Sequence, residues 1–202
     1  MSAAPDTCIS VEEYLDLERR AERKAEYYQG RICLMAGASV NHNLIAANLI
    51  AAVHGRTKGT PCRVFPSDLR VKCPSGLYTY PDAIIVCGER DLEDKHRDTL
   101  LNPTVLFEVL PPSTETYDRG AKFDHYRAIP SLQEYVLIAP DQLRIEHYQR
   151  DDNADRWTFL AHHEPAAILR LKTGDVSIPL NEIYANVELD EPRVELRTID
   201  NH

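Results

Sequence analysis

The sequence has few glycines and no long apolar run. Its eight glycines do not form a glycine-rich phosphate loop, which excludes P-loop and Rossmann nucleotide sites. The longest apolar stretch, residues 44–53, is interrupted by Asn48 and reaches only about half of the roughly 20 residues that cross a bilayer. Residues 1–6 lack the charged and apolar regions of a signal peptide. We therefore expect a cytoplasmic protein with no membrane partner and no organic cofactor.

Cysteine pairs with metal-ligand spacing are also absent. The five cysteines are an odd number and none lies in a CxxC motif, which argues against a disulfide framework and against a structural zinc site. Most of them lie in apolar runs and are expected to be small buried thiols. They are Cys8, Cys33, Cys62, Cys73 and Cys87.

Positive charge is in the minority. The chain has 23 Lys and Arg residues against 32 Asp and Glu residues, which gives a net charge of −9. This balance argues against a non-specific nucleic-acid coat protein, because such binders usually carry a broad basic face. It does not exclude an enzyme that meets DNA through a local basic groove and a metal ion.

The composition is that of one globular domain, because 202 residues that are 43% hydrophobic fit a single core of ordinary size. We expect its core over about residues 10–150, further strands over about residues 155–185 and an acidic tail over about residues 186–202.

Three helices are predicted. Ser10 and Glu13 have the spacing of a capping box, and helical periodicity continues to about residue 26. Residues 41–57 carry a wide apolar stripe that is typical of a helix packed on a sheet. A third helix over residues 115–128 ends before Pro130. Its expected inward positions are Tyr117, Ala121, Tyr126 and Ile129.

Short runs of β-branched and aromatic residues predict the strands. A Gln29-Gly30 turn signal indicates a hairpin over residues 27–35. The central strands are expected at residues 62–65, 68–73, 80–86 and 105–110, and another strand at residues 133–139. Alternating runs after residue 143 are typical of antiparallel hairpins. Helices interspersed with strands therefore predict an α/β fold with a mixed sheet.

Glu108 is the informative anomaly, because it lies inside an apolar strand-like run. A buried carboxylate there costs several kcal/mol unless a partner compensates it. Asp82 likewise opens an apolar run, and period-2 geometry lets both side chains converge if the two strands are neighbours. Two such carboxylates bind a hard cation such as Mg²⁺ or Mn²⁺ or, as an equally weighted alternative, form buried salt bridges with Arg70 and Lys72.

Lys122 follows on the third predicted helix, one turn after Asp118. A lysine beside a metal-bound carboxylate pair orients a water or neutralises charge on a phosphate. The alternative is an Asp118–Lys122 surface pair, worth only a few tenths of a kcal/mol.

An ordered set of short motifs carries a family resemblance. The motifs are Glu26-Tyr27-Tyr28-Gln29-Gly30-Arg31-Ile32, Met35-Ala36-Gly37-Ala38-Ser39, His42, Pro81-Asp82, Glu108-Val109-Leu110, Pro112-Ser113-Thr114, Asp118, Lys122, Tyr126 and Glu134-Tyr135-Val136. The set resembles the Uma-two family of the PD-(D/E)XK restriction-endonuclease-like superfamily. This resemblance implies a mixed β-sheet core flanked by helices, with additional antiparallel hairpins in the C-terminal part.

The resemblance also implies a Mg²⁺-dependent phosphodiesterase, with Mn²⁺ as a substitute. Asp82 and Glu108 are then the metal-binding acids, Lys122 is the catalytic lysine, and Glu26 is a further acid from the first helix. The superfamily usually places its lysine two residues after the glutamate, where this chain has Leu110. The lysine role therefore moves to Lys122.

Contacts with the DNA backbone are expected from basic residues. The candidates are Arg19, Arg20, Arg23 and Lys24 near the end of the first helix, with Arg119 beside the site. The four near the first helix are, by themselves, more typical of a solvated helix face. His42 is a candidate phosphate donor, although a histidine at a helix start is more often a cap or a packing residue.

The first functional hypothesis is a metal-dependent DNA endonuclease that acts as a homodimer, because two-fold symmetry suits the cutting of both strands. The alternative is a catalytically silent nuclease-fold binding or regulatory module. An open cleft in which Asp82, Glu108 and Lys122 converge favours the enzyme, whereas a closed site or a solvent-facing lysine favours the module. A phosphodiesterase that acts on RNA or a small substrate is a third hypothesis.

Overall fold

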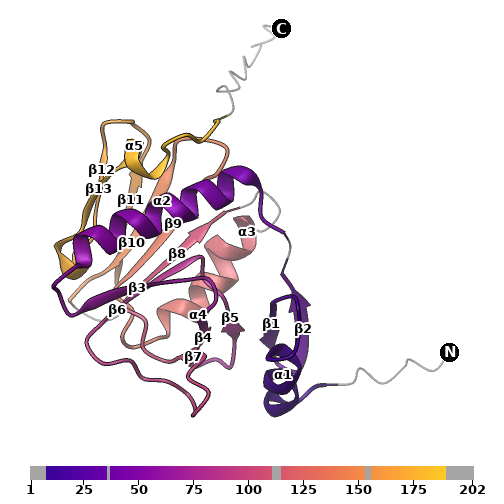
Figure 1. Cartoon of the computed structure of the whole chain (residues 1–202). Coiled ribbons are helices and arrows are strands. Elements are labelled where there is room, and N and C mark those ends of the chain that lie inside the picture. The colour runs from indigo at the N-terminus through magenta and orange to yellow at the C-terminus, as the bar shows by residue number, and fades with distance from the viewer. Residues whose placement is uncertain (1–7, 36, 111–114, 153–155, 190–202) are drawn as a thin grey trace, which may run out of the picture.

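The structure is a computed structural model that describes residues 8–35, 37–110, 115–152 and 156–189 (Figure 1). Most of the expected acidic tail lies outside these ranges. The larger sheet has six strands in the order β11-β10-β9-β8-β6-β3, of which β8 and β9 are parallel and the other neighbours antiparallel. These strands are β3 (Cys62–Pro66), β6 (Ala83–Cys87), β8 (Val105–Val109), β9 (Glu134–Ile138), β10 (Ile145–Arg150) and β11 (Trp157–His162).

A second sheet has five short strands in the order β2-β1-β5-β4-β7, and a two-stranded sheet pairs β12 with β13. The strands are β1 (Ala25–Tyr28), β2 (Arg31–Leu34), β4 (Arg70–Lys72), β5 (Tyr78–Thr79), β7 (Thr99–Leu100), β12 (Ile168–Arg170) and β13 (Ser177–Pro179). The antiparallel β9-β10-β11 and β12-β13 pairings confirm the predicted C-terminal hairpins.

Few helices accompany these sheets, and α2 lies across the larger one (Figure 1). The helical elements are α1 (Val11–Glu18), α2 (Val40–Thr57), α3 (Glu115–Tyr117), the π-helical turn η1 (Asp118–Lys122), α4 (Phe123–Arg127), the 3₁₀ turn η2 (Thr173–Asp175) and α5 (Leu180–Ile183). Within the described ranges, no helix combines the length and apolar character needed to span a membrane. The predicted α/β fold with a mixed sheet is confirmed.

Alternation along β6 and β8 directs side chains into two separate cores. Ile85 and Phe107 pack in the core that contains α2. Ile84 and Leu106 pack on the other face, with Tyr126 of α4. Burial of both faces explains why these central strands are continuous apolar runs in the sequence.

The first helix begins as predicted but is shorter. The Ser10 hydroxyl accepts a hydrogen bond from the Glu13 N–H at 3.2 Å, and the Glu13 side chain completes the capping box. The helix ends at Glu18, so Glu26 lies on strand β1 and its placement on the helix was wrong. Helical periodicity beyond residue 18 was a local coincidence, because pairing of β1 with β2 and β5 determines the structure there.

The predicted hairpin over residues 27–35 is confirmed. Gln29 and Gly30 have φ values of 47° and 80°, which is the conformation that lets a two-residue turn follow the twist of its strands. This turn orients β1 so that Glu26 and Tyr28 share one face of the small sheet.

The prediction for the cysteines needs one correction. Cys62 and Cys87 lie directly opposite each other on β3 and β6 and form a disulfide. The two residues are 25 positions apart, and this cross-strand pairing is invisible in cysteine spacing. Of the other three, Cys73 is a buried thiol as expected, whereas Cys8 and Cys33 are exposed.

Glu134, at the start of β9, is a fully buried carboxylate. It lies 2.8 Å from His147 Nε2 and accepts backbone hydrogen bonds from Lys172 and Thr173 at 3.1 and 2.8 Å. Burial alone raises the pKa of such a carboxyl, but the donors outweigh burial and lower the pKa of Glu134. The Glu134 carboxylate therefore connects β9 to β10 and to the segment after β12 through these contacts.

Glu134→Gln is expected to lower the free energy of unfolding by about 2 kcal/mol near neutral pH, because an amide satisfies these donors less well than a carboxylate. The folded-state pKa lies below the unfolded-state value of about 4.3. The carboxylate's contribution is therefore complete well above about pH 4.3 and is lost as the pH falls through the folded-state pKa. Urea unfolding of both proteins at several pH values checks this. A difference that stays constant into acid would contradict it.

Candidate active site

Glu108 lies on β8, and Asp82 lies directly before the neighbouring strand β6. In the antiparallel β6–β8 pair, Ala83 is opposite Phe107, so Asp82 and Glu108 each lie one residue beyond this paired position. The Asp82 N–H donates a hydrogen bond to the Phe107 carbonyl at 3.0 Å. The two side chains are 12% and 8% exposed. The two strands are neighbours, which was the condition for the two acids to converge.

The helical segment formed by α3, η1 and α4 covers Glu108. Lys122 Nζ lies 2.9 Å from Glu108 Oε1 and 3.4 Å from Asp118 Oδ1. The Tyr126 hydroxyl donates to the same Glu108 oxygen at 2.7 Å. Lys122 and Asp118 are both buried, which excludes the alternative that they form a surface pair. The predicted lysine therefore contacts the predicted glutamate directly.

The inward face of this segment is more polar than predicted. Tyr126 and Ile129 are buried as expected, whereas Tyr117 is 40% exposed and Ala121 is also exposed. The π-helical turn η1 occupies residues 118–122, and such turns recur at functional sites. The buried side chains of η1, Asp118 and Lys122, are charged, and Lys122 pairs with the Glu108 carboxylate of β8.

Glu26 reaches the same ammonium group from the small sheet. Its Oε1 lies 3.2 Å from Lys122 Nζ and accepts a hydrogen bond from the Thr79 hydroxyl on β5. The Thr79 hydroxyl also lies 3.4 Å from the hydroxyl of Tyr126. The cluster is thus built from both sheets and from the helical segment.

Asp82 is held in place by two groups. Its Oδ2 accepts a hydrogen bond from the Val109 N–H at 2.7 Å, and His42 Nε2 lies 3.2 Å from the same oxygen. His42 stands in the first turn of α2, where the Ser39 side chain caps the helix. The helix start therefore positions His42 against Asp82, and its contact with DNA stays a prediction.

Burial and mutual repulsion dominate the electrostatics of the cluster. Burial raises the pKa of Glu108, the charges of Asp82 and Asp118 raise it further, and Lys122 opposes the rise. Burial lowers the pKa of Lys122, but its acidic neighbours outweigh burial and raise that pKa well above its usual value. Lys122 is therefore a fixed positive charge among acids.

The two cations proposed as salt-bridge partners lie elsewhere. Arg70 is buried beside Thr99, Tyr80 and Asp98, at 3.0, 2.9 and 3.1 Å. Lys72 pairs with Glu93 at 2.5 Å. The hypothesis that Arg70 and Lys72 neutralise Asp82 and Glu108 was therefore wrong, and Lys122 has this role for Glu108.

The basic residues expected to contact DNA are in part held by acids. Arg19 pairs with Asp94 and Asp98, both at 2.7 Å, and Lys24 pairs with Asp68 at 2.6 Å. Arg20 is exposed and lies 3.8 Å from Asp16, and Arg23 is exposed. Arg119 contacts Glu115 and Glu146. Their contacts with DNA stay predictions.

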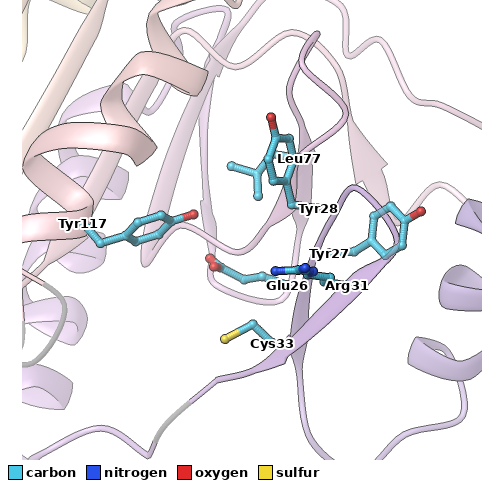
Figure 2. A pocket seen from close by; sticks show the side chains of 7 residues that line it. All are labelled: Glu26, Tyr27, Tyr28, Arg31, Cys33, Leu77 and Tyr117. Atoms are coloured by element: carbon cyan, nitrogen blue, oxygen red, sulfur yellow. The ribbon is translucent and has the colours of Figure 1, made fainter. Parts of the chain in front are cut away.

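A pocket opens beside the carboxylate cluster (Figure 2). It encloses about 400 Å³, part of it open to solvent. Its lining residues are Glu26, Tyr27, Tyr28, Arg31, Cys33, Leu77 and Tyr117. Glu26 is shared between the pocket and the cluster, so the cluster has a route to solvent on this side.

Two contributions to the site escaped the sequence reasoning. Thr79 belongs to a two-residue strand, which is too short to show a periodic pattern. His42 was singled out, but its contact with Asp82 joins residues 40 positions apart in sequence and depends on how α2 packs on the sheet. The sequence signal for His42 was its position in the first turn of a predicted helix, and this signal does not identify its partner.

Comparison with known proteins places this chain in a family. The sequence model of Uma2, described as "Putative restriction endonuclease", matches residues 11–180. This chain belongs to the Uma2 family. Two relatives of this Uma2 chain occur in Synechocystis sp., the uncharacterized proteins slr1290 and sll1609. The first is 36% identical over 183 residues, covering 90% of this chain and 94% of the relative. The second is 37% identical over 151 residues, covering 74% and 85%.

A solved structure confirms the fold of this Uma2 chain. The crystal structure of a putative nuclease belonging to DUF820 from Anabaena variabilis superposes with a TM-score of 0.71. The match covers 87% of this chain and 97% of the other, at 19% sequence identity. The predicted architecture, a mixed sheet flanked by helices with additional antiparallel hairpins, is therefore shared with that protein. The family's description as "Putative restriction endonuclease" supports a nuclease-type function.

Proposed function

We propose that this Uma2 chain is a metal-dependent phosphodiester hydrolase of the PD-(D/E)XK type that cuts DNA and acts as a homodimer. One observation carries the proposal. Asp82 and Glu108 each lie one residue beyond the paired Ala83 and Phe107, and the Lys122 ammonium lies 2.9 Å from Glu108. Two carboxylates that can hold a hard metal ion, with a lysine beside them, suit metal-dependent phosphodiester hydrolysis.

The side chains suit Mg²⁺ or Mn²⁺ by their chemistry. Glu26, Asp82, Glu108 and Asp118 bring four carboxyl groups to the cluster, against the single ammonium of Lys122. A divalent cation offsets the remaining negative charge, and oxygen ligands suit a hard ion. Among the described residues, no group of three or more Asp, Glu, His or Cys side chains is already arranged to hold a metal ion. Binding therefore requires side-chain adjustment.

Asp82 and Glu108 would hold the ion in this proposal. When bound, a divalent cation lowers the pKa of a coordinated water and stabilises charge on the phosphate. The chain's own residues do the positioning. Tyr126 fixes the orientation of Glu108, and the Val109 N–H with His42 fixes that of Asp82. Lys122 brings a fixed positive charge to the attacking water or to the phosphate.

The silent binding module remains the second candidate, and one observation favours it. The side chains of Lys122 and Glu108 are only 6% and 8% exposed, so the centre of the cluster is nearly closed. Against it, the lysine points into the cluster and not to solvent, and the pocket reaches Glu26. The two functions differ in whether cleavage occurs.

Cleavage of supercoiled plasmid DNA decides between them. With Mg²⁺ or Mn²⁺, the wild-type protein is expected to nick or linearise the plasmid, and excess EDTA or the Asp82→Asn variant is expected to stop it. Size-exclusion chromatography tests the dimer. Cleavage that continues in EDTA would overturn the metal dependence. If the folded protein leaves plasmid intact but cuts RNA or a small phosphodiester, the proposed substrate is wrong and the hydrolase remains. If it binds DNA but cuts none of these substrates, the result favours the silent module.

A further inference from the structure

The pocket beside Glu26 has a chemistry that the hydrolysis site does not use. Tyr117 lies on its helical side and Tyr28 on its hairpin side, and Leu77 adds an apolar wall (Figure 2). The Tyr28 ring also contacts the His125 ring edge-to-face, with 4.7 Å between the ring centroids. Arg31 brings a guanidinium group to the same pocket.

The position of the pocket relates it to the scissile phosphate. Tyr117 directly precedes Asp118 in the chain, and Asp118 contacts Lys122. Glu26 contacts Lys122 at 3.2 Å and also lines the pocket. Because Glu26 belongs to both the pocket and the cluster, a group bound in the pocket lies next to the position where the proposed chemistry takes place.

Tyr117 is an aromatic side chain that is left 40% exposed at this position. A flat ring at the mouth of a pocket offers a stacking surface for another planar ring. Arginine is suited both to phosphate contacts and to stacking on planar groups. The combination fits a nucleotide with its base against tyrosine and its backbone near the basic group.

We propose that this pocket binds an unpaired nucleobase of the substrate, next to the phosphate that is cut, with Tyr117 as the stacking platform. The inference rests on the proposed nuclease function and narrows its substrate. A base within a duplex is already paired and stacked, so it enters a side pocket only from a single strand or after flipping out. The preferred substrate is therefore DNA with unpaired nucleotides at the cleavage position.

Binding without cleavage tests the pocket independently of activity. The full-length protein is titrated into a fluorescein-labelled single-stranded DNA oligonucleotide with Ca²⁺ in place of Mg²⁺, and the dissociation constant is measured by fluorescence anisotropy. Tyr117→Ala is expected to bind about 10-fold more weakly, because stacking is lost, whereas Tyr117→Phe keeps the wild-type affinity to within about two-fold. Phe159→Ala, on β11, removes another exposed aromatic and is expected to have no effect.

Two further probes separate stacking from charge. An abasic strand of the same length keeps its phosphates but has no base to stack, so Tyr117→Ala is expected to leave its affinity unchanged. The matching duplex is expected to be similarly insensitive. Equal affinity of wild type and Tyr117→Ala for the single strand would overturn the proposal, and so would an equal loss on the abasic strand or the duplex.

The plasmid experiment distinguishes the failure of this inference from that of the proposed function. Metal-dependent cleavage without any dependence of binding on Tyr117 would leave the nuclease in place and remove the base pocket. Binding that depends on Tyr117, without cleavage of either the plasmid or the single-stranded oligonucleotide in Mg²⁺ or Mn²⁺, would keep the pocket and make the protein a single-strand binding module.

Discussion

Glu108→Gln is expected to reduce metal-dependent DNA cleavage at least about 1,000-fold. The substitution keeps the size of the side chain and an oxygen that can accept the Tyr126 hydrogen bond, but it removes the negative charge that the proposal assigns to metal binding. Initial rates of plasmid nicking at saturating Mg²⁺ measure the effect. Circular dichroism and thermal unfolding show whether the variant is folded.

Glu146→Gln is the matched control. Glu146 is another largely buried carboxylate, but it lies on β10 and pairs with Arg119 and Arg144. Its substitution is expected to change stability modestly and to leave the cleavage rate within about three-fold of wild type. A folded Glu108→Gln variant with a rate similar to that of Glu146→Gln would contradict the site assignment.

Lys122→Met is expected to lower the free energy of unfolding by about 3–5 kcal/mol. Methionine fills a similar volume, but it leaves Glu26, Glu108 and Asp118 without the ammonium that lies within 3.4 Å of each. Removing one partner from a buried charged group is costly because the remaining charges stay desolvated. Chemical denaturation in EDTA measures this loss.

Lys72→Met provides the comparison for Lys122. Lys72 pairs with Glu93 but keeps 36% of its side chain exposed, so its loss is expected to cost about 1 kcal/mol or less. Mg²⁺ is expected to restore more stability to Lys122→Met than to wild type, because a cation replaces the missing charge. Equal stability of the two methionine variants would show that Lys122 does not neutralise the cluster.

Asp82 and Glu108 could be predicted from the sequence because the pattern that marks them, an acid in an apolar run, is local. A carboxylate in an apolar strand is anomalous wherever the strand lies, and period-2 alternation limits the faces it can occupy. Glu108 and Asp82 were therefore found without knowledge of the fold, and the observed pairing of Ala83 with Phe107 brings these two neighbouring positions close together. Their predicted roles in metal binding stay predictions.

The remaining site contacts depend on long-range packing. Glu26 was placed on a helix because local periodicity continued past residue 18, whereas strand pairing determined its structure. The sequence alone left Arg70 and Lys72 as plausible partners of the two acids and left Lys122 with a surface-pair alternative, and the family resemblance then gave Lys122 its catalytic role. The disulfide between Cys62 and Cys87 likewise depends on a cross-strand contact that spacing does not encode.

Binding of Mn²⁺ tests the central claim most directly. Titration of the metal-free protein with Mn²⁺, followed by electron paramagnetic resonance, is expected to reveal a site in the wild type that is lost in Asp82→Asn and in Glu108→Gln but kept in Glu146→Gln. Undiminished binding in both site variants, or no binding by folded wild-type protein, would contradict the assignment of Asp82 and Glu108 as metal ligands.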